Sequence, residues 1–163
     1  MASKFRSDDV WTEITRAVKK TPGRCDVAVA YFSQGAARRL PLAKGSNLVV
    51  DMSEGAVKAG QTDPREVIKL LKRGVRVHTV QDLHAKAFVI GGRAIVGSMN
   101  ASRRSAEQLF EAAIDTTEKE VVASCRLWVR GLLGEEVTPK YARKVAKLYK
   151  PSKPSSPARK RKR

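Results

Sequence analysis

The chain has 163 residues, 42% of them hydrophobic, which is enough for one domain with a buried core and argues against a wholly disordered protein. No apolar run approaches the roughly 20 residues of a membrane span, and the N-terminal residues lack the apolar core of a secretory signal, so we expect a cytoplasmic protein without membrane insertion. Two cysteines and two histidines are too few for a disulfide scaffold or a zinc site, so no metal or other cofactor is expected. A net charge of +17, from 33 Lys and Arg against 16 Asp and Glu, favours a polyanionic partner, either nucleic acid or an anionic membrane.

The first half of the chain alternates predicted helices and strands. In residues 8–20 apolar side chains recur at helical spacing, with Ser7 or Asp8 as the expected cap and Pro22 as the stop signal. A variant of the capping box at Asp63 begins another helix. The elements that follow the first helix are a strand at 25–32, a short helix at 35–40, a strand at 47–52, a polar loop at 53–62 and a helix at 64–73.

The second half contains the strongest turn signal of the chain. Gly91, Gly92 and Arg93 join two predicted strands, 84–90 and 94–97, as a hairpin. The remaining elements are a strand at 75–80, a loop with helix-compatible residues at 100–109, a strand at 110–116 and a helix at 118–133. Together these elements predict an α/β fold with a mixed central β-sheet flanked by helices.

Composition divides the chain into a folded body at 1–138, a basic helical segment at 139–150 and a disordered basic tail at 151–163. The tail carries six positive charges and no negative ones, and its removal leaves +11 on residues 1–150. Because the body is basic as well, polyanion binding is favoured over a mere solubility feature. The basic segment repeats Lys and Arg at helical spacing, which leaves a membrane-surface helix as an alternative.

The hairpin carries the residues that point to chemistry. His84 and Lys86 are two apart on a predicted strand, so both side chains leave the same face of the sheet. A lysine within a sheet is seldom buried without a partner, so the pair needs a reason. A three-residue loop at 91–93, which the glycines favour, would place Ser98 opposite Lys86 and Asn100 opposite the histidine. A two-residue loop would shift the register by one and turn Ser98 to the other face.

Such a cluster of an imidazole, a cation, a hydroxyl and an amide suits the binding of a phosphate. The lysine would neutralise the anion, and the hydroxyl and amide would donate hydrogen bonds to its oxygens. The imidazole can act as a nucleophile or proton carrier near neutral pH. From the spacing alone, a strand end that emerges into solvent explains the same residues equally well.

The pattern resembles the motif of the phospholipase D superfamily, in which His-x-Lys is followed by an aspartate and then by Gly-Ser-x-Asn. A glutamate follows this motif at the start of the next strand. The matching residues in this chain are His84, Lys86, Gly97, Ser98, Asn100 and Glu111. Gly91 occupies the position of the motif aspartate, and the interval to Gly97 is one residue shorter than usual. The resemblance covers roughly residues 5–135.

The resemblance implies that the body is a phospholipase D-like catalytic domain completed as a homodimer. Family members pair two such motifs around one phosphate, and this chain has one. His84 would attack phosphorus and form a phosphohistidine, while the second copy's imidazole would protonate the leaving oxygen and then activate a water. Lys86, Ser98 and Asn100 would hold the phosphate oxygens in place of a metal ion. Glu111 would accept a hydrogen bond from the imidazole nitrogen that faces away from phosphorus.

The function expected from these residues is a metal-independent phosphodiesterase or endonuclease that cleaves nucleic acid with little sequence specificity. DNA is favoured over RNA as the substrate, and the sequence does not decide between them. One alternative is a phospholipase D-like nucleic-acid-binding protein whose hydrolytic site is impaired, as Gly91 suggests. Another is a phosphodiesterase that acts on phospholipid or a small diester. His78 is interpreted as a structural or surface residue, and Asp82 and Asp115 are interpreted as structural. The residues expected to bind nucleic acid are basic, namely Arg103, Arg104, Lys140, Arg143, Lys144, Lys147, Arg159, Lys160, Arg161, Lys162 and Arg163.

Overall fold

The computed structural model describes residues 3–152. The predicted disorder of the tail beyond residue 152 lies outside the described residues. The same holds for the tail residues expected to bind nucleic acid, which are Arg159, Lys160, Arg161, Lys162 and Arg163. Between residues 3 and 152, none of the helices has the length and apolar character needed to span a bilayer.

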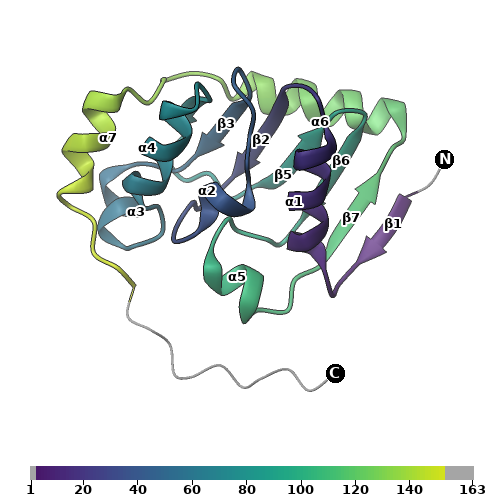
Figure 1. The fold of residues 1–163 in the computed structure, drawn as a ribbon, viewed down its shortest axis with the longest axis horizontal. Coiled ribbons are helices and arrows are strands. Elements are labelled where there is room, and N and C mark those ends of the chain that lie inside the picture. The colour runs from purple at the N-terminus through teal and green to yellow at the C-terminus, as the bar shows by residue number, and fades with distance from the viewer. Residues whose placement is uncertain (1–2, 153–163) are drawn as a thin grey trace.

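A mixed sheet of seven strands, in the order β1-β7-β6-β5-β2-β3-β4, forms the centre of the molecule (Figure 1). The strands are β1 (Ser3–Arg6), β2 (Cys25–Val29), β3 (Asn47–Val50), β4 (Arg76–Thr79), β5 (Lys86–Ile90), β6 (Arg93–Gly97) and β7 (Ala113–Thr116). The strands β2, β3 and β4 run parallel, and the pairs on the other side of β2 are antiparallel. The predicted α/β fold with a mixed sheet is confirmed. The strand β1 was not predicted, because its one large apolar residue, Phe5, shows no alternation.

Helices cover the two faces of the sheet unequally. They are α1 (Val10–Lys20), α2 (Ala36–Arg39), α3 (Glu54–Lys58), α4 (Pro64–Lys72), α5 (Arg103–Glu107), α6 (Lys119–Gly131) and α7 (Pro139–Ala146). The helix α6 lies behind the sheet in Figure 1, against β2, β5 and β6, whereas α1, α2 and α4 lie in front. The helix α3 lies within the stretch predicted as a loop, and the cap of α1 is Asp9 rather than either residue expected.

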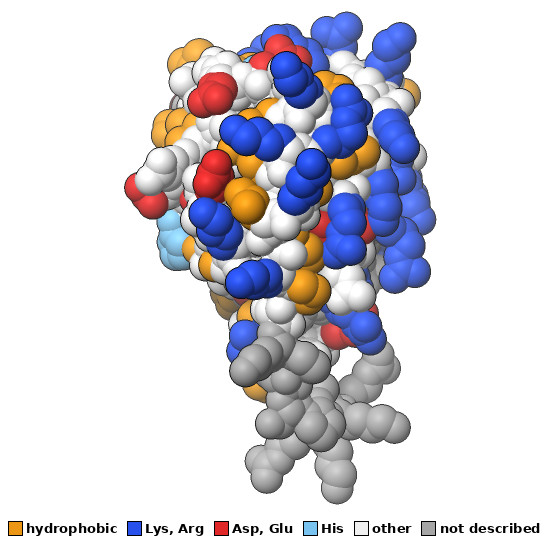
Figure 2. All heavy atoms as spheres, turned by 90° about the vertical axis from the view of Figure 1, so that its left-hand side faces the viewer, with side chains coloured by type: hydrophobic (Ala, Val, Ile, Leu, Met, Phe, Trp, Pro, Cys, Tyr) orange, Lys and Arg blue, Asp and Glu red, His pale blue; other side chains and the backbone are white. Residues whose placement is uncertain are grey.

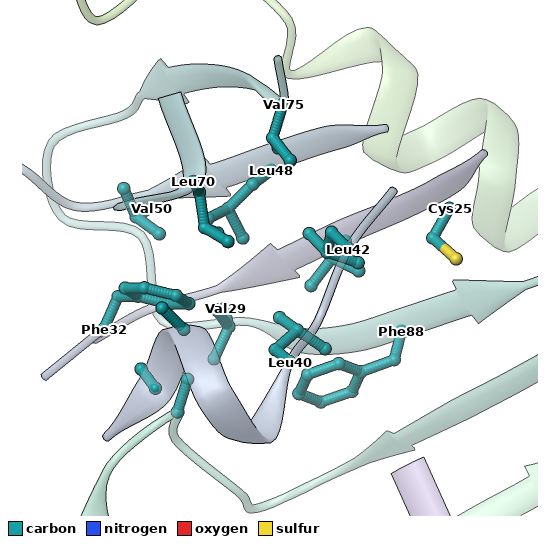
Figure 3. Close-up of a cluster of buried hydrophobic side chains, with 14 of the residues drawn as sticks. Cys25, Val29, Phe32, Leu40, Leu42, Leu48, Val50, Leu70, Val75 and Phe88 are labelled. Carbon is teal, nitrogen blue, oxygen red and sulfur yellow. The ribbon is translucent and has the colours of Figure 1, made fainter. Parts of the chain in front are cut away.

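The larger core lies between the sheet and the front helices. Figure 3 shows part of it, with Phe32, Leu40 and Phe88 among the fully buried side chains. The indole of Trp11 meets the ring of Phe88 edge to face, with centroids 5.6 Å apart. Aromatic pairs in this geometry add about 0.5–1.5 kcal/mol beyond the area that they bury. This packing anchors α1 to β5, the strand that begins at Lys86.

The hairpin register differs from the one expected. Ile90 pairs with Arg93, so a two-residue turn of Gly91 and Gly92 joins β5 and β6. Gly91 has φ +58°, the left-handed region that glycine occupies without steric cost. The expected loop at 91–93 is therefore wrong, and Ser98 does not lie opposite the lysine in the ladder.

Apolar side chains remain exposed on the part of the sheet that α6 leaves uncovered. Phe5 of β1 and Val96 of β6 are both cross-strand partners of Ile114 in β7. These three residues are exposed, at 70%, 45% and 49% of their surface, and Trp128 at the edge of α6 is 49% exposed. We call these four residues the apolar strip.

Candidate active site

His84 and Lys86, the predicted His-x-Lys pair, lie beside each other at the end of the sheet where β2 ends and β5 begins. Lys86 is the first residue of β5 and pairs with Val29, the last residue of β2. His84 lies two residues earlier, outside the strand, and is exposed, whereas Lys86 is only 9% exposed. The ammonium Nζ lies 3.2 Å from His84 Nε2 and donates to the His84 carbonyl oxygen at 2.9 Å. An ammonium can only donate hydrogen bonds, so this contact favours the tautomer with the proton on Nδ1 and with the lone pair of Nε2 accepting from Lys86.

The electrostatics of Lys86 follow from its burial. Burial lowers the pKa of its ammonium, and the carboxylate of Glu111 nearby offsets part of that lowering. A desolvated cation in contact with an imidazole is poised to bind an anion that restores what solvation it has lost. The pair thus forms a single donor site for phosphate oxygens beside a nucleophilic nitrogen.

Ser98 and Glu111 stand on the other side of this site. The strand β6 ends at Gly97, and the Ser98 hydroxyl donates to Glu111 Oε2 while it accepts from the backbone N–H of Ala112 at 3.1 Å. Ser98 is exposed and lines a pocket with His84 and Lys86. Ser98, the first residue after β6, therefore contributes its side chain to the site from outside the strand. It does not lie opposite Lys86 in the ladder, which is the position expected.

Asn100 occupies a different position from the other motif residues. Its Oδ1 accepts the backbone N–H of Tyr31 at 3.3 Å, and the residue is half-exposed. The backbone of Ala101 bonds to Tyr31, and Ser33 bonds to Ala101, which closes the loop after β2 against the loop after β6. In this structure the amide thus joins the two loops that frame the site.

Glu111 makes a pair of hydrogen bonds that differs from the one expected. Its Oε1 accepts from Ser105 Oγ at 2.5 Å and its Oε2 from Ser98, and within residues 3–152 no hydrogen bond joins it to His84. Ser105 is buried, and its hydroxyl accepts from Trp11 Nε1 at 3.2 Å. A chain of hydrogen bonds thus runs from the buried Trp11 on α1, through Ser105 and Glu111, to the exposed Ser98. Sequence reasoning missed Ser105, because nothing in a short helical stretch marks one serine as buried.

Two pockets share His84. The first, of about 810 Å³, is lined by Lys86, Ser98 and the apolar side chains of Val96 and Trp128, among others. The second, of about 720 Å³, lies beside the ends of β3 and β4. Its lining includes four carboxylates and no lysine or arginine, and the acidic residues are Asp51, Glu54, Asp82 and Glu135. The two sides of the histidine thus differ in charge, with the cation on one side and carboxylates on the other.

The remaining acid and histidine candidates have structural surroundings. His78 is buried on β4, with Nδ1 3.3 Å from the carbonyl oxygen of Gly134, and it lines neither pocket. Asp115 is buried and bonds to Arg6 and Arg93, which ties β1 and β6 to β7. These two were expected to be structural, and the structure agrees. Asp82, which has φ +62°, donates its backbone N–H to Asp51 and also lines the acidic pocket.

The basic residues expected to bind nucleic acid lie on two helices. Arg103 and Arg104 are exposed on α5, directly after the Asn100 loop, and Arg103 pairs with Glu107. The other four described residues are exposed at the end of the molecule formed by α7, and they are Lys140, Arg143, Lys144 and Lys147. Only the α5 group adjoins the loops around the site.

A comparison with known protein families identifies the family of this chain. A sequence profile for the family described as "Cardiolipin synthase, PLD-like domain" matches residues 14–132, most of the chain. The chain belongs to this phospholipase D-like family. The resemblance seen in the motif is confirmed, and the matched range contains every motif residue.

Solved structures agree with the assignment to the phospholipase D-like fold. NucT from Helicobacter pylori superimposes with a TM-score of 0.66 at 13% identity, covering 83% of this chain and 98% of that one. Nuc from Salmonella typhimurium, a phospholipase D family member, gives 0.66 at 12% identity, with 83% and 97% covered. TrmBL2, an archaeal chromatin protein, gives 0.57 at 9% identity, with 84% and 55% covered. A comparison with curated proteins finds no match.

Proposed function

We propose that this phospholipase D-like chain hydrolyses nucleic-acid phosphodiester bonds without a metal ion, through a phosphohistidine at a site completed by a second copy. The observation that carries the proposal is the contact between His84 Nε2 and the buried ammonium of Lys86 at the mouth of a pocket that Ser98 also lines. An imidazole can attack phosphorus, and a neighbouring buried ammonium and hydroxyl can donate hydrogen bonds to the phosphate oxygens.

The chemistry proceeds in two displacements. In the first, the Lys86 ammonium turns from His84 Nε2 to a phosphate oxygen, and the lone pair released on Nε2 forms a bond to phosphorus as the bond to the leaving oxygen breaks. The imidazole of the second copy gives that oxygen a proton. In the second, that imidazole removes a proton from water, whose oxygen displaces the histidine from phosphorus. The products are an alcohol and a phosphomonoester, and both imidazoles return to their starting states.

The other residues stabilise the charge that develops on the phosphate. Lys86 supplies a cation that is already held in place by the His84 carbonyl. The Ser98 hydroxyl is oriented by Glu111 and by the backbone of Ala112, and it lies in the pocket that the phosphate would enter. Fixed donors of this kind contribute about 2.7–4 kcal/mol each to catalysis in enzymes where one has been removed. With a second copy, two lysines and two serines would surround one phosphate.

A homodimer is proposed because one chain supplies one histidine and its neighbouring surface is apolar. Val96 and Trp128 belong to the apolar strip and also line the pocket that holds His84. Phe5 and Ile114 continue the strip across β7 and β1. A two-fold contact through this strip would bury the exposed apolar groups and bring the two pockets together, since an isologous interface uses the same patch on both subunits.

Nucleic acid is the proposed substrate because the chain carries a net charge of +17. A second candidate is supported by Gly91, which stands where the family motif has an aspartate. On that view the chain binds nucleic acid but hydrolyses it slowly or not at all. Gly91 lies in the turn beyond β5, at the far end of the strand from Lys86, so a side chain at this position would not reach the phosphate.

The test is digestion of plasmid and oligonucleotide in EDTA. Wild type should cleave, His84→Ala and Lys86→Ala should each lose at least about 100-fold in rate, and Lys19→Ala, which removes an exposed cation from α1, should keep wild-type activity. Cleavage that requires magnesium, or that survives His84→Ala, would exclude the covalent mechanism. Binding without cleavage by wild type supports the impaired-site candidate, and hydrolysis of phospholipid alone supports a lipid substrate.

A further inference from the structure

We propose that α4 and α7 together form a second nucleic-acid surface, which binds the backbone of a duplex segment away from the catalytic pocket. This inference rests on the proposed nucleic-acid substrate and adds the strandedness of the segment that is bound. Figure 2 shows Lys and Arg side chains spread over this end of the molecule, with hydrophobic and other side chains and some Asp and Glu between them. Residues 63–76 and 139–150 contain ten Lys and Arg against two carboxylates.

Each of the two helices carries its cations in one row. Lys140 and Lys144 on α7 and Lys147 at its C-cap are spaced at i, i+4 and i+7, opposite the buried Ala142 and Val145. Within the described chain none of the three lysines makes an ion pair, although Glu135 precedes the helix by only a few residues. Seven residues of helix span about 10 Å.

The row on α4 repeats this pattern. Arg65, Lys69 and Lys72 are exposed and spaced in the same way as the lysines of α7, while Val67 and Leu70 are buried beneath them. Arg65 pairs with Asp63 and Lys69 with Glu66, but both carboxylates are buried, so the outer surface keeps its positive sign. We call the two rows together the α4–α7 ridge.

The two rows lie side by side because α7 packs directly on α4. The axes of packed helices lie about 8–10 Å apart. A duplex presents two rows of phosphates on either side of a groove about 6 or 12 Å wide, whereas a single strand presents one. Phosphates of one strand are spaced about 3.4 Å apart along the duplex axis, so each row of cations, about 10 Å long, spans about three phosphates of one strand. The ridge therefore fits a duplex backbone.

The surface is unsuited to a lipid membrane. The apolar residues of α7 are turned inward, since Ala142 and Val145 are buried and Leu148 and Tyr149 pack against the core. A helix that binds at a membrane surface needs an exposed apolar face to insert. The ridge offers exposed cations without such a face.

The ridge is also separated from the catalytic pocket. The acidic pocket, lined by Asp51, Glu54, Asp82 and Glu135, lies between His84 and α7, whose Tyr141 forms part of its wall. Carboxylates repel phosphates, so one backbone would not follow the surface from the ridge through this pocket to the histidine. The duplex on the ridge is therefore a different segment from the one that is cleaved.

The experiment measures binding of a 20-bp DNA duplex and of a single strand with the same length, using the full chain with His84→Ala so that nothing is cleaved. The α7-row variant is Lys140→Glu, Lys144→Glu and Lys147→Glu, and Arg65→Glu with Lys72→Glu tests the α4 row. The matched control is Lys4→Glu, Lys19→Glu and Lys20→Glu, three exposed cations of β1 and α1 that lie away from the ridge.

The ridge predicts at least tenfold weaker duplex binding for either row variant and little change for the control. The dependence of log affinity on log salt should become shallower by about 2–3 in the α7-row variant, because each lost phosphate contact removes about 0.9. Lysine-to-glutamine versions of the same residues should give a smaller loss of the same kind, and melting temperatures check that each variant is folded. All substituted side chains are exposed. Arg65 also pairs with the buried Asp63, so the α4-row variant should lose the most stability, and Lys72→Glu alone tests that row without breaking this pair.

Three results would overturn the inference. The first is a loss of duplex affinity in the control variant equal to that in the row variants. The second is binding of the single strand by the His84→Ala chain as tight as binding of the duplex. The third is a row variant that loses binding to phosphatidylserine vesicles, measured alongside, while its duplex binding is unchanged. The outcome is independent of catalysis. If wild type hydrolyses no diester, the proposed function is wrong. The binding measurements still decide whether the α4–α7 ridge binds a duplex.

Discussion

Replacing Ser105 with alanine removes the buried hydroxyl at the centre of the hydrogen-bond chain that holds Glu111. The hydroxyl donates to Glu111 at 2.5 Å and accepts from Trp11 Nε1 at 3.2 Å, and the residue is only 3% exposed. A hydrogen bond to a charged group is worth about 1.5–3 kcal/mol and a neutral one about 0.5–1.5 kcal/mol. We therefore expect Ser105→Ala to lower the free energy of unfolding by about 2–4.5 kcal/mol.

The same change should slow catalysis, because Glu111 keeps only Ser98 as a partner and the Ser98 hydroxyl loses its fixed orientation. Misplacement of a catalytic group by about 1 Å costs up to about 100-fold, so kcat on a small diester should fall at least about tenfold. The KM for that diester should change little, since Ser105 itself does not line the pocket. This split between kcat and KM separates a positioning residue from one that only stabilises the fold.

The matched control is Ser102→Ala. Ser102 caps α5 by accepting the backbone N–H of Ser105, and it has no bond to Glu111. Loss of this cap should cost about 1 kcal/mol of stability and leave kcat unchanged. Stability is measured by urea unfolding and kcat well below the melting temperature. The positioning role is refuted if the two variants lose kcat in proportion to their loss of stability, or if Ser105→Ala keeps wild-type kcat.

Three further predictions concern stability and assembly. Burial raises the pKa of Asp115, but bonds from its two arginines outweigh this and leave the pKa lowered, so its stabilisation is present above about pH 4 and is lost as the pH falls further. Asp115→Asn should flatten the acid limb of a plot of melting temperature against pH, and an unchanged limb would contradict the assignment. Gly91→Ala should cost about 1–2 kcal/mol in urea unfolding because its φ is +58°, whereas Gly92→Ala, next to it with open space around it, should cost clearly less. Ile114→Asp, in the apolar strip, should convert the proposed dimer to monomer in sedimentation and abolish cleavage, whereas Thr12→Asp on α1 should do neither; a dimer that survives the change would exclude this interface.

Local sequence patterns determined most of the elements. The capping residue Asp63 does accept the N–H of Arg65 at the start of α4, because a cap depends only on neighbours in the chain. The Glu66 of the same expected capping box instead accepts the N–H of Ala37 from another helix. That contact joins residues far apart in the sequence, so no local rule contains it.

The candidate site shows the same division. The motif names His84, Lys86 and Ser98, and the structure brings these three to one pocket. The predicted strand pairing that was to bring them together is wrong. The two-residue turn shifts the register by one residue, and Ser98 lies just beyond the end of β6. The partners of Glu111 came from the packing of α1 and α5, which spacing along the chain does not specify.

The sequence by itself determined the family, the mixed α/β architecture and the identity of the reactive side chains, since all three depend on residue types at short spacings. Only the tertiary structure decided which groups share a pocket, how charge is divided around His84 and how two basic rows come together on α4 and α7. The physical reason is that hydrophobic burial is not directional. It determines that a helix face or strand must be covered, and chain packing as a whole selects the neighbour that covers it.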